Sequence, residues 1–174
     1  NQFDDALEVF KKFKKHPEQT NIANNNRLSY DMAYIYFKLG EYEFALKSFE
    51  SFNAVNSSFD TSYQRDTFLR MGDCQFALKQ YWSAMENYNT AIAFSPKQAA
   101  YALFQKGMSY GLVNRNPKKI ETLLVLVTQH KRDPLVDDAL FELASSYSRE
   151  GNTLEAISTY DNLLDNYNNS PYLP

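Results

Sequence analysis

The sequence predicts an all-α fold, an α-α superhelix (solenoid) of about four and a half helix pairs. In one series, positions recur every 35 to 39 residues, counted through Ala6, Ala45, Ala84, Lys119 and Ala156, and all but Lys119 are small residues with an aromatic residue four positions later. Its members are Ala6 with Phe10, Ala45 with Phe49, Ala84 with Tyr88, and Ala156 with Tyr160. A second series, Ala33, Gly72, Gly107 and Ala144, lies twelve residues ahead of Ala45, Ala84, Lys119 and Ala156. Two small-residue series at a constant offset indicate helix pairs whose axes approach closely.

The apolar residues of the first full unit follow the helical period. Leu28, Met32, Ile35 and Leu39 recur at three- and four-residue intervals, Gly40 interrupts them, and a second helical run follows. The same pattern predicts the other helices along the chain. The predicted helices span residues 3–15, 25–39, 42–54, 61–78, 81–94, 97–113, 117–130, 134–150 and 153–167.

Capping residues support several of these starts. Ser95, Asn116 and Asp133 each stand directly before a proline, which suits the first turn of a helix because its missing N–H has no partner to lose there. Asn152 with Glu155 three residues later resembles a capping box.

The third unit departs from the pattern. Lys119 stands where a small residue is expected, so we expect its second helix to be displaced or tilted. Lys79 likewise stands where Gly40 and Gly151 end other helices.

The repeats define the expected organisation of the chain. We expect a single array over residues 1–174, with units at about 1–20 (second helix only), 25–56, 61–95, 97–131 and 133–168. Because the chain begins inside a second helix and ends in what looks like the opening of another unit, we expect a fragment of a longer array.

The repeat pattern resembles the tetratricopeptide repeat (TPR). The residues that carry the resemblance are Ala33, Tyr36, the run Leu39-Gly40-Glu41-Tyr42, Ala45 and Phe49. The last unit, from Asp138 through Ala144, Gly151, Ala156 and Tyr160 to Tyr172, is similar to repeats of bacterial periplasmic TPR proteins. These include the Tol-Pal-associated TPR domain and the outer-membrane assembly lipoproteins. That resemblance implies a periplasmic or outer-membrane-associated location, and a cytoplasmic location stays open.

Composition and motifs favour binding over catalysis. A net charge of -3, from 18 basic and 21 acidic residues, gives no electrostatic footprint for nucleic acid, and the apolar run 123–127 is too short to insert in a membrane. We expect no cofactor and no metal, because ligand spacings and nucleotide-binding loops are absent from the sequence. His16 and His130 are interpreted as closing second helices, and Cys74 as a packed thiol. We expect no enzymatic activity.

The TPR resemblance implies a concave groove lined by the first helix of each unit. The candidate partner-binding residues are Arg27, Tyr34, Phe37, Lys38, Asp73, Phe76, Tyr101 and Met108. Tyr30, Leu69 and Phe104 lie in the same stripe and are interpreted as packing against the neighbouring unit. For Tyr34, Phe37 and Phe76, burial and exposure stay open. The Lys and Asn carboxylate clamp of chaperone-binding TPRs is absent, because Tyr30, Tyr34, Leu69 and Asp73 hold those positions.

Two functions follow from these expectations. The first is a non-catalytic scaffold that binds a protein or peptide segment in the groove. The alternative is an architectural spacer or a module that associates with itself through the ends of the array.

Overall fold

The fold consists of helices. The computed structural model describes residue 8 and residues 22–55, 61–167 and 169–172, and this part of the chain contains α-helices, a short 3-10 helix and no strand. The all-α prediction is therefore confirmed. The predicted helix 3–15 lies outside the described residues apart from Glu8. The chain divides into two compact units, Asn1–Phe94 and Ser95–Pro174. From here on, first unit and second unit refer to these two parts of the chain and not to single repeats.

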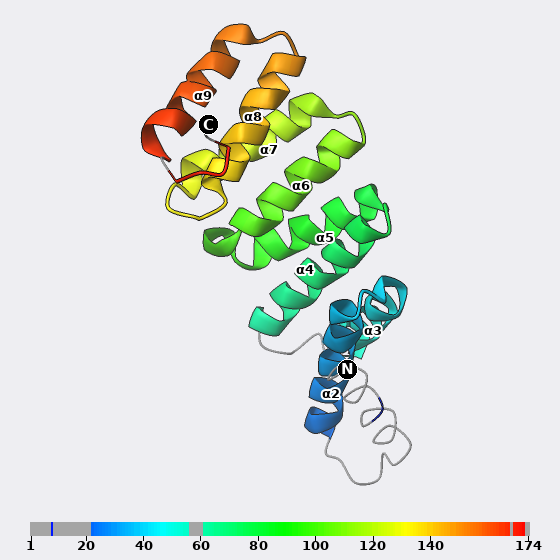
Figure 1. The fold of residues 1–174 in the computed structure, drawn as a ribbon. Helices are drawn as coiled ribbons and strands as arrows, with labels where there is room; N and C mark the ends of the chain where they lie inside the picture. Colours follow the sequence, from blue (N-terminus) through cyan, green and yellow to red (C-terminus); the bar gives the residue numbers. More distant parts are fainter. Residues whose placement is uncertain (1–7, 9–21, 56–60, 168, 173–174) are drawn as a thin grey trace. The chain divides into compact units, whose positions relative to one another are not determined.

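The first unit contains two helix pairs. They are α2 (Ile22–Lys38) with α3 (Tyr42–Val55), and α4 (Thr61–Ala77) with α5 (Tyr81–Phe94) (Figure 1). Each helix packs against the next along the chain. The predicted bounds agree within three residues, the largest difference being at the start of α2.

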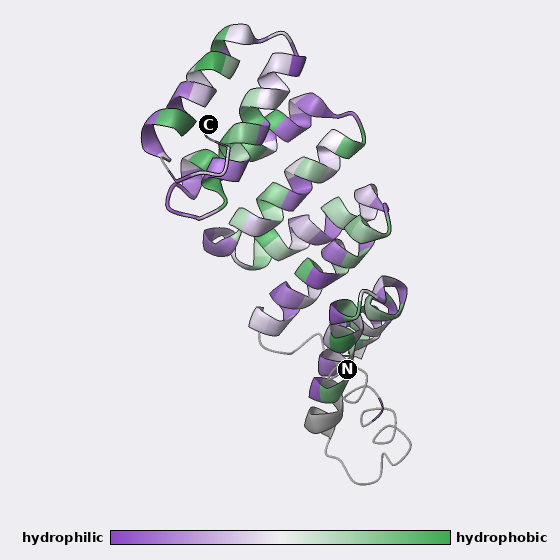
Figure 2. Ribbon diagram, viewed as in Figure 1, coloured by the Kyte–Doolittle hydropathy of each residue, from purple (hydrophilic) through white to green (hydrophobic). Residues whose placement is uncertain are grey.

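The second unit repeats this arrangement. A 3-10 helix (Pro96–Gln98) precedes α6 (Ala100–Leu112), which pairs with α7 (Asn116–Gln129), and α8 (Val136–Arg149) pairs with α9 (Thr153–Asn166). Hydrophobic and hydrophilic residues alternate around these helices, as in the first unit (Figure 2). This mixture is typical of helices that bury one face against their neighbours.

The predicted side-chain caps are mostly wrong. Ser95 leads into the 3-10 helix and not into α6, Asn116 is itself the first residue of α7, and Asn152 makes no side-chain hydrogen bond to the start of α9. Asp133 does serve the next helix start, since its Oδ1 accepts the N–H of Leu135 at 3.0 Å, just before α8.

Backbone hydrogen bonds explain why Asn152 needs no capping box. Gly151, with φ +78°, ends α8 in the left-handed region. The N–H of Asn152 then donates to the carbonyl of Tyr147 at 2.9 Å, and its carbonyl accepts the N–H of Ala156 at 3.0 Å. The turn that ends one helix thus begins the next.

A residue in the left-handed region also lies in the turn between the two helices of every other described pair. Gly40 has φ +77°, and Lys79 and Asn114 take up φ +61° and +58° without being glycine. Lys79 therefore replaces Gly40 and Gly151 without changing the turn.

The small residues lie where the helices of a pair cross. Ala33 and Ala45 are fully buried in the core of the first unit, together with Phe49. A Cβ added to Gly72 of α4 would lie 2.6 Å from the ring of Tyr88 on α5. Small residues on one helix thus make room for large side chains on its partner.

Lys119 stands at the position where the other helix pairs have a small residue, and its long side chain is nevertheless buried. Its side chain is 4% exposed, and its Nζ lies 2.6 Å from Oε2 of Glu142 on α8. The aliphatic stem runs beside Gly111 of α6, whose missing side chain leaves room for it. The long residue is accommodated within the pair, with its charge turned toward the following helix.

Candidate partner-binding surface

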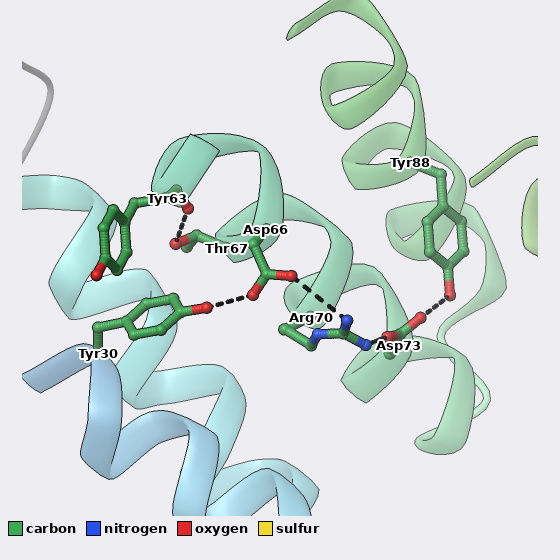
Figure 3. A network of polar contacts seen from close by, with 7 residues as sticks. All are labelled: Tyr30, Tyr63, Asp66, Thr67, Arg70, Asp73 and Tyr88. Carbon is green, nitrogen blue, oxygen red and sulfur yellow. Dashed lines mark hydrogen bonds and ion pairs between the residues drawn. The ribbon is translucent and has the colours of Figure 1, made fainter. Parts of the chain in front are cut away.

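Arg70 is the centre of a charged network on α4 (Figure 3). Its Nη1 donates to Oδ2 of Asp73 at 2.7 Å, and its Nη2 donates to Oδ1 of Asp66 at 3.3 Å. The three residues are spaced three and four positions apart, so they lie on one face of the helix. The two carboxylates hold the guanidinium in one orientation.

Two tyrosines join this network to the neighbouring helices. The hydroxyl of Tyr30 on α2 donates to Oδ2 of Asp66, and the hydroxyl of Tyr88 on α5 donates to Oδ1 of Asp73 at 3.0 Å. Burial, followed by the hydrogen bond to Asp66, raises the pKa of Tyr30, so its hydroxyl remains a donor. Three helices of the first unit are therefore fixed around Arg70.

Aromatic rings of α2 lie close to the charged groups of Arg70 and Lys38. The Arg70 guanidinium carbon lies 5.5 Å from the ring centre of Phe37 and 5.9 Å from that of Tyr34. The ammonium of Lys38 lies 5.3 Å from the same Tyr34 ring. These distances are within the range of cation–π attraction. This face of α2 thus combines aromatic rings with charge.

A pocket of about 460 Å³ adjoins the network in the first unit. It is lined by Tyr30, Asp31, Tyr34, Ile35 and Asp66. The Asp31 side chain is 42% exposed and lies 3.9 Å from Nε of Arg27, which is 70% exposed. Partial burial raises the pKa of Asp31, and the Arg27 charge opposes that shift.

The structure brings together four of the candidate residues. Tyr34, Phe37 and Asp73 contact Arg70, Lys38 lies over the Tyr34 ring, and the Asp73 side chain is only 8% exposed. We therefore expect Asp73 to orient Arg70 and not to contact a partner directly.

The remaining candidates lie elsewhere. Arg27 pairs with Asp31, and Phe76 packs edge-on against Tyr81 of α5 at 5.5 Å between ring centres. Tyr101 and Met108 are half-buried on α6, in the second unit. Of the residues interpreted as packed, Leu69 is buried. Tyr30 and Phe104 are half-buried.

Arg70 was not among the candidate residues predicted from the sequence. The signal was present in its spacing to Asp66 and Asp73, which predicts ion pairs on a helix face. Its contact with the α2 rings depends on how two helices pack and could not be read from one helix alone.

The described residues give few groups suited to catalysis. Cys74 is fully buried, and burial raises the pKa of its thiol to about 12, so the thiolate is disfavoured. No group of three or more His, Cys, Asp or Glu residues in the described part of the chain could hold a metal ion. The helices described are also too short or too polar to cross a bilayer.

Comparison with known proteins identifies the repeat. Residues 138–170 match the family described as tetratricopeptide repeat. The chain has a TPR fold. A search of curated proteins finds no match to the sequence.

Solved structures resemble the chain over nearly its whole length. A crystal structure of MamA is similar with a TM-score of 0.78 and 22% identity, covering 94% of this chain and 87% of that one. YrrB, described as a TPR protein with an unusual peptide-binding site, gives a TM-score of 0.71 and 20% identity over 95% of this chain and 78% of its own. The TPR-like repeats of a putative kinesin light chain from Podosopora anserina give a TM-score of 0.74 and 16% identity, covering 93% of this chain and 85% of that one. At these identities the likeness shows the TPR fold.

Proposed function

We propose that the protein is a non-catalytic scaffold whose TPR helices bind a segment of a protein partner. The observation that carries this proposal is the half-exposed aromatic face of α2, held in place by Arg70 and flanked by charged groups. Aromatic residues and arginine are the side chains that most often dominate binding at protein interfaces. The peptide-binding site described for YrrB supports the same class of function.

The geometry suits recognition of a partner better than reaction chemistry. Arg70 is oriented by two carboxylates, and those carboxylates are oriented by tyrosines, so little side-chain entropy is lost on binding. The rings of Tyr34 and Phe37 can bury their remaining exposed surface under a partner segment.

The test compares two triple variants. Partners captured on the immobilised protein would be identified by mass spectrometry, purified, and titrated by calorimetry. We expect Tyr34→Ser, Phe37→Ser and Phe76→Ser together to weaken binding at least about 30-fold, since one anchor residue is typically worth about 2 kcal/mol. The matched control replaces Phe44, Trp82 and Leu124 with Ser, because these side chains are 58%, 56% and 37% exposed on second helices.

The outcomes separate binding from folding. Circular dichroism and melting temperature should stay close to the parent protein in both triple variants. If the first variant unfolds, its rings belong to the core. If it stays folded and binds as tightly as the control, the surface around Arg70 is not the binding site.

Self-association is the second candidate function. Leu154, Ile157 and Leu164 leave an apolar stripe on α9, with exposed fractions of 80%, 53% and 48%. Light scattering over a concentration series tests it, because a rise in mass without any partner favours an architectural or self-associating module.

A periplasmic or outer-membrane-associated location is also part of the proposal. Its basis is the resemblance of the last unit to bacterial periplasmic TPRs. Fractionation of cells that carry the gene would test it.

A further inference from the structure

The pocket beside Tyr30 has acidic and aromatic walls. Its lining consists of two carboxylates, two tyrosine rings and Ile35, with no lysine or arginine among the lining residues. The Asp31 side chain keeps 42% of its surface exposed, and that of Asp66 keeps 24%. A charged group in the pocket can therefore reach both acids.

Asp31 and Asp66 each have an arginine of the chain nearby, but neither carboxylate is fully occupied by it. Arg27 Nε lies 3.9 Å from Asp31, too far for a hydrogen bond, and the arginine is mostly exposed. Asp66 accepts one bond from Arg70 and one from Tyr30, and each carboxylate oxygen can accept more than one. Acceptor capacity for an incoming N–H donor thus remains at both residues.

The tyrosine wall already attracts positive charge. Lys38 and Arg70 of the chain itself both lie within 6 Å of the Tyr34 ring centre. The Tyr30 hydroxyl donates to a carboxylate, which increases electron density on the ring and strengthens its attraction for a cation. The rings and the acids therefore favour the same kind of group.

We propose that this pocket receives one basic side chain, arginine or lysine, of the partner segment. The inference rests on the proposed scaffold function and gives the chemistry of one contact within it. Its volume of about 460 Å³ is ample for a guanidinium or an ammonium with its aliphatic stem. The rest of the segment would run over the exposed rings of α2.

The experiment is an NMR titration of the isotope-labelled protein with four small probes. They are the Nα-acetyl amides of arginine, lysine, citrulline and glutamate, and citrulline is the uncharged counterpart of arginine. We expect arginine and lysine to shift amide signals of residues 28–38 and 62–70, and citrulline and glutamate to leave them unchanged. Raising the salt concentration should reduce the arginine shifts, because partly exposed ion pairs are screened.

Three variants sharpen the test. Asp31→Asn keeps the shape and removes the charge, and should weaken arginine binding about three- to fivefold, the range for a partly exposed ion pair. Glu50→Gln removes the same charge at an exposed site of α3 and should leave binding unchanged. Lys38→Gln removes a cation that competes for the Tyr34 ring, and should maintain or strengthen binding.

Several results would overturn the assignment. Equal shifts with arginine and citrulline would show that charge is not recognised, and equal losses in Asp31→Asn and Glu50→Gln would show a general field effect. If arginine fails to bind while the Tyr34, Phe37 and Phe76 variant still loses its partner, the scaffold function stands and the cation pocket does not. If arginine binds and that variant keeps its partner, the pocket stands and the proposed groove fails.

Discussion

At Gly72 the contact between α4 and α5 leaves no room for a side chain. A Cβ there would lie 2.6 Å from Cε1 of Tyr88, and Tyr88 is fully buried with its hydroxyl bonded to Asp73. We expect Gly72→Ala to lower the free energy of unfolding by about 1–3 kcal/mol, because overpacking outweighs the helix propensity gained by alanine. Urea unfolding followed by circular dichroism measures it.

Gly111→Ala is the matched control for this prediction. Its added Cβ would lie 3.1 Å from Cδ of Lys119, an atom in a flexible stem that can shift. We expect a change within about 1 kcal/mol, since alanine adds up to about that much helix propensity. Equal losses in both variants would show that the Tyr88 contact is not what limits position 72.

The thiol of Cys74 gives a second prediction at the scale of one residue. Burial raises its pKa from 9.0 to about 12 in the folded protein. We expect a thiol reagent at pH 8.5 to modify Cys74 slowly in the native protein and rapidly in urea. Fast native labelling would contradict the packed position.

The sign of the pH dependence follows from the same shift. The unfolded chain loses the Cys74 proton at a lower pH than the folded chain does. Its contribution to stability is therefore fully present below about pH 9 and is lost as the pH rises toward about 12.

What could be predicted at this scale depended on repetition. Ala33, Ala45 and Gly72 were found because their positions recur, and a recurring small residue has one structural reason to be small. Arg70 does not recur in the other units. Its role comes from the rings of a neighbouring helix, and sequence spacing within α4 gives no access to those.

Between α7 and α8, the Lys119–Glu142 pair joins two elements that belong to successive repeats. We expect Glu142→Leu to lower the free energy of unfolding by about 3–5 kcal/mol, because it leaves the buried ammonium of Lys119 unpaired. Lys119→Met should cost less, since Glu142 is 27% exposed and water can reach its carboxylate. The double variant should lie within about 1–2 kcal/mol of the parent protein, as replacing a buried pair by apolar residues is often neutral.

A double-mutant cycle in urea decides this prediction. The coupling between the two positions should be clearly favourable, while the dependence on urea concentration stays constant. If the losses in unfolding free energy of the two single variants simply add in the double variant, the 2.6 Å contact between Lys119 Nζ and Glu142 Oε2 contributes little to holding α8 against α7.

Helix bounds were predictable, whereas the side-chain caps at helix starts were not. Apolar periodicity gives the extent of a helix from many residues at once, so α5 was predicted at its observed limits, Tyr81–Phe94. A side-chain cap rests on a single residue, and at Asn152 the turn around Gly151 had already satisfied the backbone. Local capping rules fail where one helix ends directly before the next begins.

Across the whole chain, the TPR fold followed from the repeat period, whereas the candidate surface followed only in part. The TPR resemblance implied that the first helix of each pair lines the groove, and this stays a prediction. It could not indicate that Tyr34 and Phe37 lie against one arginine in the first unit, with Lys38 over the Tyr34 ring, while Tyr101 and Met108 lie in the second.

The division into two compact units leads to a prediction for the whole molecule. In repeat proteins, stability is approximately a sum of local terms, and regions can open separately. We expect Gly72→Ala to accelerate amide hydrogen exchange mainly in α4 and α5, and Glu142→Leu mainly in α7 and α8. Mass spectrometry of peptides from each unit measures the two patterns. Equal acceleration throughout the chain by either variant would mean that all described helices unfold as one cooperative body, because damage in one unit would then lower the protection of both.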